Sequence, residues 1–291
     1  MSTSTPQRVA GQRGAAEHYR RARTLRLRVE LRRQLGRRRT QIALGFLVVL
    51  PFLLLIAFSI GSSDPNRNSG QFVDLATSGG LNFVVFTLFA SASFLLIVVV
   101  ALFFGDTVSS EASWSSLKYL LTIPVPRGRL LRQKAIVAGG LSLLGLVLLP
   151  AVALGVGVLA YGAGGVSTPL GEGVGFSAGV LRLLLVVAYL AVHLYWVAGT
   201  ALLLSVLTDA PLGAVGGTVG VSILSQILDS ITALGGLREY LPTHFAYAWS
   251  DLLSQQIDWN SAVRGALSAL VYGTVFVALA AYRFHRKDIA S

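Results

Sequence analysis

The residues that could perform chemistry are few and widely separated in this chain of 291 residues. There is no Cys, which excludes disulfides, thiolate metal sites and cysteine nucleophiles. The four histidines are far apart in the sequence, and no two of them have the spacing of a helical metal site such as HxxxH: His18, His193, His244 and His285. The sequence therefore predicts no metal centre.

Enzymatic motifs are also missing from the sequence. An ATP-binding P-loop ends in Gly-Lys-Ser or Gly-Lys-Thr, but the three Lys are followed by Tyr119, Ala135 and Asp288. Intramembrane proteolysis would need a Ser–His pair or two neighbouring aspartates. Asp209 and Asp229 lie at opposite ends of the apolar runs described below, too far apart to share a proton. We predict that the chain is not an enzyme and holds no cofactor of its own.

Long apolar runs must position the remaining polar groups. Hydrophobic residues make up 54% of the chain and charged residues only 13%, about half the charge of a soluble domain. Six runs could cross a hydrocarbon layer about 30 Å thick: Ile42–Ile60, Phe83–Phe104, Ala135–Tyr161, Leu183–Leu207, Leu212–Leu228 and Ala262–Tyr282. A membrane barrel would instead alternate in segments of about ten residues. We predict an all-α, polytopic membrane protein with six transmembrane helices in residues 41–282.

The distribution of basic residues predicts the orientation of these spans. The net charge is +11, and 21 of the 24 basic residues are Arg. Twenty of the 24 lie in residues 1–40, in residues 105–134 or after Tyr282, all on the side of the N-terminus if there are six spans. Inside loops of membrane proteins are rich in Lys and Arg. We therefore predict that the N- and C-termini are both cytoplasmic.

The two ends of the chain are polar. We expect residues 1–15 to form a disordered tail, residues 16–40 a basic cytoplasmic helix at the membrane surface, and residues 283–291 a cytoplasmic tail. Anionic membrane lipids attract such polybasic segments, although a contact with a partner protein is the other interpretation. No base-stacking aromatic residue interleaves with Arg20–Arg39, so nucleic acid is not an expected partner.

A few polar side chains within the predicted spans could line a cavity: Thr87, Ser91, His193, Thr218, Ser222 and Gln226. A cavity with so little charge suits an amphipathic substrate such as a drug, a lipid or a peptide. His193 could relay a proton or contact the substrate, or it could be a neutral imidazole that bonds to a neighbouring helix. Glycines four residues apart between positions 213 and 220 favour close helix packing, within the chain or across a dimer.

The loop of residues 105–134 has the pattern of a docking element for a partner. Trp114, Leu117 and Leu121 have helical i, i+3, i+7 spacing, and Glu111 is expected in the first turn of that helix. The prolines at 124 and 126 end it, and a second helix is predicted to begin near Arg127.

This loop resembles that of ABC transporter permeases of the ABC-2 type. Those proteins show a Glu, a Thr-Leu-x-x-Leu-Leu-like stretch, Pro-Val-Ser-Arg, a Leu-Leu pair and a Lys. The corresponding residues here are Glu111, 116–121, 124–127, Leu130-Leu131 and Lys134, with Ser116 in place of the usual Thr and Pro126 in place of the usual Ser. The segments 241–252 and 283–289 are similar to the family's region before its last span and to its basic ending.

The resemblance implies the permease subunit of an ATP-binding cassette exporter in the cytoplasmic (inner) membrane of a prokaryote. A separate ABC ATPase would bind ATP and Mg, and a second permease copy, identical or related, would complete the transporter. The ATPase-coupling loop would use Glu111, Trp114, Leu117, Tyr119, Pro124 and Arg127. Outer re-entrant or interfacial helices in residues 233–259 would gate the exit through Phe245, Trp249 and Leu252.

Two alternatives stay open at this point. The chain could be a non-enzymatic polytopic membrane protein of a sensor or immunity type, or a proton-coupled carrier without an ATPase. Within the predicted spans, His193 is the only ionisable side chain that could exchange a proton near neutral pH, which disfavours the carrier. Copurification of an ATP-binding protein would distinguish the exporter from both.

Overall fold

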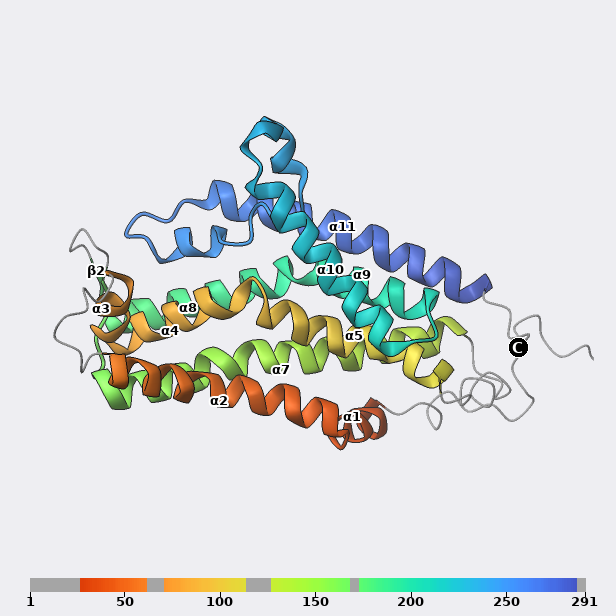
Figure 1. Ribbon diagram of the computed structural model, residues 1–291, viewed down its shortest axis with the longest axis horizontal. Coiled ribbons are helices and arrows are strands. Elements are labelled where there is room, and N and C mark those ends of the chain that lie inside the picture. Colours follow the sequence, from red (N-terminus) through yellow and green to blue (C-terminus); the bar gives the residue numbers. More distant parts are fainter. Residues whose placement is uncertain (1–26, 62–70, 114–126, 168–172, 287–291) are drawn as a thin grey trace, which may run out of the picture.

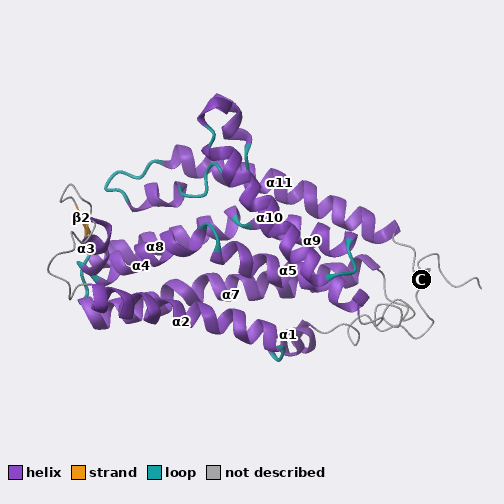
Figure 2. Ribbon diagram, in the orientation of Figure 1, coloured by secondary structure: helices purple, strands orange, loops and turns teal. Residues whose placement is uncertain are grey.

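The computed structural model describes residues 27–61, 71–113, 127–167 and 173–286. Its elements are α1 (Leu27–Leu35), α2 (Arg38–Gly61), α3 (Gln71–Thr77), α4 (Gly80–Ala92), α5 (Leu95–Ser113), α7 (Arg127–Tyr161), β1 (Val166–Ser167), β2 (Gly173–Val174), α8 (Phe176–His193), α9 (Tyr195–Leu207), α10 (Pro211–Ser230), η1 (Thr232–Tyr240), η2 (Ala248–Leu253) and α11 (Trp259–Arg286). Helices form nearly all of this structure (Figure 2), which confirms the all-α prediction apart from one antiparallel pair of two-residue strands, β1 and β2.

The long helices run side by side along the longest axis of the molecule (Figure 1). α5 is central, because it packs against α7 on one side and against α9 and α10 on another. α2 and α4 pack on α7, and α11 packs on α9. Buried apolar side chains from these helices form one continuous core. The functional positions that lie in the described residues therefore belong to one bundle.

Apolar side chains also cover much of the outside of the bundle. Ile42 and Ile60, at opposite ends of α2, are each 70% exposed, and Leu159 of α7 is 90% exposed. Side chains of this kind are stable against lipid tails, whereas a soluble protein rarely exposes so large an apolar surface. The polytopic membrane architecture is thus supported both by the lengths of the helices and by what they leave uncovered.

Five helices of the described residues are long and apolar enough to cross a membrane: Arg38–Gly61, Gly128–Tyr161, Phe176–Leu207, Pro211–Ser230 and Trp259–Arg286. A sixth crossing exists if α4 and α5, which are bent by 55° relative to each other, count as one broken span. The predicted apolar runs therefore match helices, and the cytoplasmic location of the termini stays a prediction.

Two predicted spans are interrupted. The run Phe83–Phe104 is not a single helix, because α4 ends at Ala92 and α5 begins at Leu95. A break frees backbone carbonyls that need a partner in the apolar interior. Gln226 of α10 supplies one, since its Nε2 donates to the carbonyl of Ser93 at 2.9 Å. The fourth run begins earlier than predicted, at Phe176, and is divided at Leu194 between α8 and α9.

The basic N-terminal helix is also divided. Its described part consists of α1 and the first turn of α2, with a turn at Gly36 and Arg37 between them. The predicted disordered tail and residues 16–26 lie outside the described residues. Leu27, Leu31 and Leu35 are all more than one-third exposed, as a helix at the membrane surface requires. That location stays a prediction.

Glycines allow two of the closest helix contacts. A Cβ at Gly157 of α7 would lie 2.8 Å from the carbonyl oxygen of Gly80, at the start of α4. A Cβ at Gly199 of α9 would lie 2.7 Å from the carbonyl oxygen of Gly273 in α11. Small residues are the usual means by which membrane helices approach closely.

The contact at Gly157 gives a testable prediction. Gly157→Leu should force α4 and α7 apart, because overpacking of a tight contact costs about 1–3 kcal/mol. We expect a lower midpoint of thermal unfolding in detergent for this variant. Gly155→Leu is the matched control, since nothing lies within 4 Å of a Cβ at Gly155 on the same helix. Equal midpoints for the two variants would contradict the packing described here.

Candidate functional site

A buried carboxylate at the end of α5 connects three helices. Glu111 is only 3% exposed. Its Oε1 accepts a hydrogen bond from Nη2 of Arg33 in α1 at 2.7 Å and another from Nζ of Lys134 in α7 at 2.5 Å. Arg33 also pairs with Glu30, one turn earlier in α1, at 2.9 Å. Since Glu111 and Lys134 flank residues 114–126, the two ends of that loop are held together by this contact.

A second carboxylate, one and a half turns earlier, fixes the start of α2. Asp106 accepts hydrogen bonds from Nη1 of Arg37 at 2.6 Å and from Nη1 of Arg39 at 2.8 Å, one on each carboxylate oxygen. These residues and those around Glu111 are called the ion-pair cluster below: Glu30, Arg33, Arg37, Arg39, Asp106, Glu111 and Lys134. The cluster joins α1 and α2 to the ends of α5 and α7.

The basic residues of the cluster compensate for the unfavourable positions of the two carboxylates in α5. Glu111 lies in the last turn of α5, where the helix dipole disfavours a negative side chain. Burial of a carboxylate adds a further cost unless it is paired and hydrogen-bonded. The arginines of α1 and α2 and Lys134 supply those partners, so the position of the N-terminal helices is set by the charges of α5.

The pKa values in α1 reflect these pairs. Burial raises the pKa of Glu30, but the charge of Lys134 and hydrogen bonds from Gln34 and Arg33 outweigh burial and hold the pKa below its ordinary value of 4.5. A lowered pKa in the folded state means that ionised Glu30 stabilises the fold. This contribution is complete above the ordinary pKa and is lost as the pH falls through the lowered one.

The neighbouring α9 is tied to the same end of α5. The hydroxyl of Ser205 in α9 accepts hydrogen bonds from the backbone amides of Val108 and Ser109, at 3.0 and 3.1 Å. All three residues are buried. The end of α5 is therefore bonded directly to α9, and α9 in turn packs along α11.

The predicted coupling residues are only partly described. Trp114, Leu117, Tyr119 and Pro124 lie outside the described residues, and Arg127 is the first residue of α7, as the proline pattern predicted. Glu111 is not in the first turn of a separate loop helix, because α5 continues without interruption to Ser113. The apolar run and the polar Ser-rich stretch after it form one helix. The change from apolar to polar residues had wrongly indicated a helix boundary between them.

Most of the predicted cavity residues use their polar groups in hydrogen bonds with the backbone of the described helices. The hydroxyl and amide side chains bond to backbone carbonyls: Thr87 to Phe83, Ser91 to Thr87, Thr218 to Ala214, Ser222 to Thr218 and Gln226 to Ser93. His193 is 4% exposed and stacks on Tyr189, with ring centroids 5.6 Å apart. Its Nδ1 has no hydrogen-bond partner among the described residues. A cavity shared with a second copy stays a prediction.

The predicted gate residues are buried at the end of the bundle opposite to the ion-pair cluster. Phe245 is 9% exposed, Trp249 is fully buried and Leu252 is 2% exposed. The ring of Trp249 lies against Phe89 of α4, with centroids 4.5 Å apart. Instead of regular α-helices, this region contains the short 3-10 helices η1 and η2, which pack on α8, α10 and α11.

The contacts by which α8 holds this region were not predicted from the sequence. Arg182 donates hydrogen bonds to the carbonyls of Leu253, the last residue of η2, and of Ser254 and Gln255, which follow it. Tyr189 donates to the carbonyl of Phe245 at 2.6 Å. An arginine near the end of a span could simply have extended to the lipid surface, and only the folded structure shows that it binds three carbonyls.

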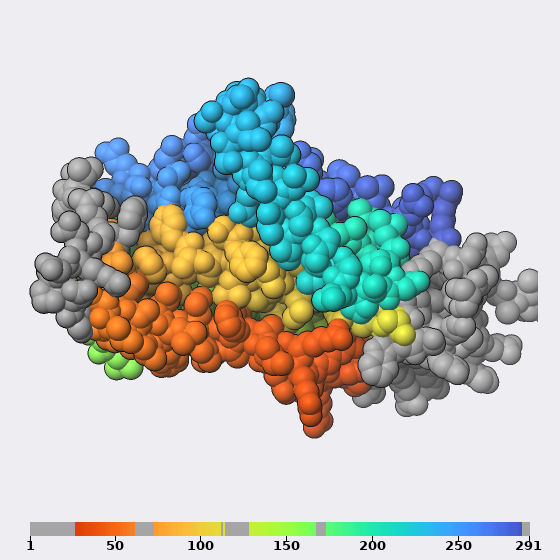
Figure 3. Space-filling model, viewed as in Figure 1, coloured from red at the N-terminus to blue at the C-terminus, as the bar shows by residue number. Residues whose placement is uncertain are grey.

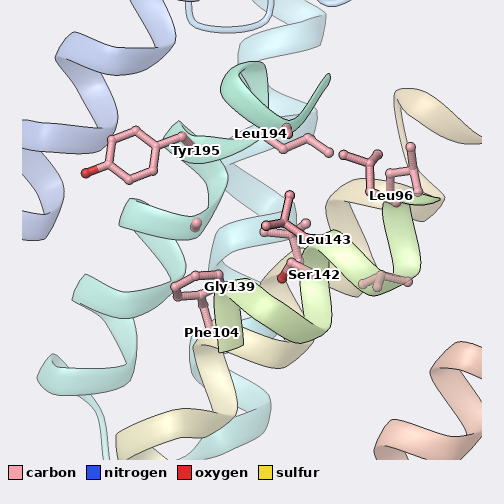
Figure 4. A pocket seen from close by; sticks show the side chains of 12 residues that line it. Leu96, Phe104, Gly139, Ser142, Leu143, Leu194 and Tyr195 are labelled. Atoms are coloured by element: carbon pink, nitrogen blue, oxygen red, sulfur yellow. The ribbon is translucent and has the colours of Figure 1, made fainter. Parts of the chain in front are cut away.

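A pocket lies between α5, α7 and the junction of α8 and α9 (Figure 4). Its volume is about 190 Å³. The lining is apolar except for Ser142 and Tyr195: Leu96, Val99, Val100, Phe104, Gly139, Ser142, Leu143, Leu146, Ala191, Leu194, Tyr195 and Ala198. None of the six predicted cavity residues belongs to this lining, and no feature of the sequence had pointed to the pocket.

Comparison with known proteins identifies a family for this arrangement. The model of the ABC-2 family transporter proteins matches residues 34–225, about two-thirds of the chain. The match begins at the end of α1 and covers the ion-pair cluster except for its first two residues. Among curated proteins, no sequence matches the chain.

The pairing of Glu111 with Lys134 gives a testable prediction. Lys134→Met should destabilise the protein by about 3 kcal/mol, because it removes one partner of a buried ion pair. The double variant Glu111→Gln/Lys134→Met should lose less stability than the sum of the two single variants. Thermal unfolding in detergent measures all three. Arg32→Met, at an exposed position of α1, is the control. Strictly additive losses would contradict a direct interaction.

Proposed function

The chain belongs to the ABC-2 family of transporter proteins, and we propose from this membership that it is the permease subunit of an ATP-driven exporter in the cytoplasmic membrane of a prokaryote. ATP would be hydrolysed by a separate ABC ATPase, which would hold ATP and Mg. The family match is the observation that carries the proposal. The missing P-loop lysine motif supports a separate ATPase, because this sequence cannot form that phosphate site.

The ATPase would contact residues 114–126 together with the adjacent ends of α5 and α7. Trp114 and Leu117 would be the apolar anchors, with Tyr119, Pro124 and Arg127 around them. The role of Glu111 differs from that of a surface contact, since it is buried and holds α1 against α5 and α7. Glu111 would keep α1 and the two loop ends moving as one unit when ATP binding displaces the loop.

Displacement of the loop would reach the rest of the bundle by two routes. The hydrogen bonds to Ser205 would transmit the displacement from α5 to α9. The helix break at Ser93, whose carbonyl is bonded to Gln226, would let α5 tilt relative to α4. A bundle with two such arrangements transports a substrate only if the substrate binds one arrangement more tightly than the other. The low charge of the spans favours an amphipathic substrate, and Phe245, Trp249 and Leu252 would close the exit on the outer side.

A second copy of the permease would pack along α10. Figure 3 shows this helix uncovered on the surface of the molecule. Gly216 and Gly220 lie on its exposed side, and nothing in the described chain lies within 4 Å of a Cβ at either position. Ile223 and Ile227 continue the same stripe and are 42% and 54% exposed. Small residues four apart with an apolar continuation favour close packing of two helices in lipid.

A test of ATPase coupling uses the loop anchors. The double variant Trp114→Ala/Leu117→Ala should lower ATP hydrolysis by the copurifying ATPase at least tenfold in proteoliposomes, because the apolar anchors of the contact are removed. Leu159→Ala, at an exposed position of α7 near the other end of the bundle, should leave hydrolysis unchanged. Unchanged hydrolysis in the double variant, or no ATP-binding protein bound to the tagged chain, would refute the proposal.

A test of the dimer uses the absence of Cys from the sequence. A single cysteine introduced as Ile223→Cys should form a disulfide-linked dimer on oxidation of membranes, because the stripe would face its own copy. The substitution Gly216→Leu in that background should reduce the linked fraction at least fivefold. Val147→Cys, an exposed position on α7, is the control for random collisions. Equal linkage at positions 223 and 147 would contradict an interface along α10.

A further inference from the structure

No residue of α10 lines the pocket of Figure 4, which is therefore separate from the predicted dimer stripe. It is bounded by α5, α7 and the α8–α9 junction and is called the α7 groove below. Leu143, on its rim, is 51% exposed. The neighbouring surface of α7 is apolar as well, since Ile136 and Val147 are each 52% exposed. The medium next to the groove is therefore lipid hydrocarbon.

The residues that line the groove determine which class of ligand can bind in it. The groove presents no charged side chain, and its polar residues are Ser142 and Tyr195. The Ser142 hydroxyl is buried without a hydrogen-bond partner among the described residues. Apolar cavities of about 150 Å³ stay dry and bind small apolar ligands, and this one measures about 190 Å³. An alkyl chain fits such a lining better than a peptide, which would bring unpaired backbone groups.

A cation lies on the same stripe of α7. Arg132, Ile136, Gly139, Leu143 and Leu146 follow one another at intervals of four and three residues, so they share one helix face. Arg132 is exposed and forms no ion pair with the residues that the structure describes. The 11 residues from Arg132 to Leu143 rise by about 16 Å, close to the thickness of one hydrocarbon leaflet of about 15 Å.

We propose that the α7 groove binds one acyl chain of an anionic phospholipid whose phosphate pairs with Arg132. The headgroup lies at the membrane interface beside the first turns of α7, where guanidinium binds phosphate strongly. The chain follows Ile136 along α7 and enters the groove at Gly139. Because α5 and α9 line the groove, the bound acyl chain contacts the two helices that the Ser205 hydrogen bonds join. Lipid composition would then affect the packing of α5 against α9.

The chain-binding step is tested with the purified full-length chain in liposomes, without any ATPase. The probe is phosphatidylglycerol that carries a photoactivatable diazirine in the middle of one acyl chain. Illumination should label peptides that contain residues 139–146 and 191–198. Gly139→Leu should reduce this labelling at least fivefold, because its side chain would project into the groove beside Phe104. Gly140→Leu is the matched control, since its Cβ meets open space.

The headgroup step is tested with two probes that share the same acyl chain. Labelling of the groove by the phosphatidylglycerol probe should exceed labelling by the phosphatidylcholine probe at least threefold, and Arg132→Gln should abolish that preference. Arg286→Gln, an exposed cation at the end of α11, should preserve it. Equal labelling in the Gly139→Leu and Gly140→Leu variants would overturn the groove assignment, and a preference that survives Arg132→Gln would overturn the assignment of the phosphate.

Discussion

The burial of Glu111 at the end of α5 is the constraint on which the arrangement of α1, α5 and the start of α7 depends. A carboxylate in that position is disfavoured both by the helix dipole and by its removal from water, so it must be paired. Arg33 and Lys134 pair with it, and they belong to α1 and α7. The same contact therefore sets where the N-terminal helix lies and how close together the two ends of the segment 114–126 are held.

Polar side chains elsewhere in the bundle stabilise irregular backbone within and between the helices that cross the membrane. The bend between α4 and α5 persists in an apolar interior because Gln226 binds the carbonyl of Ser93. Arg182 of α8 likewise binds the carbonyls of Leu253, Ser254 and Gln255 at the end of η2, where irregular backbone is buried among packed helices. Both are places where backbone that lacks helical hydrogen bonds is buried in protein instead of exposed to lipid. Such breaks are where a bundle of otherwise rigid helices can bend.

The sequence predicts the helices far better than it predicts their contacts. Long apolar runs must form helices in lipid, which is why the ends of α2, α7, α10 and α11 fall within a few residues of the predicted spans, apart from the polar turns that extend α2, α7 and α11. The break at Ser93 depends on Gln226, which is 133 residues away, and periodicity carries no information at that separation. Glu111 was recognised as important, but its partner Arg33 is 78 residues away in a run of similar arginines, so burial in the cluster could not be foreseen. The α7 groove is formed jointly by residues of α5, α7, α8 and α9, so no local sequence pattern predicts it.

Site-specific photo-crosslinking in native membranes tests most directly the proposed contact between a separate ATPase and the segment between Glu111 and Lys134. A photoactivatable amino acid replaces Leu117 in one strain and Leu159, near the opposite end of α7, in another. The account predicts that an ATP-binding protein is crosslinked from position 117 and not from position 159. Crosslinks from position 117 only to proteins on the outer side of the membrane, or equal ATPase crosslinking from both positions, would contradict it.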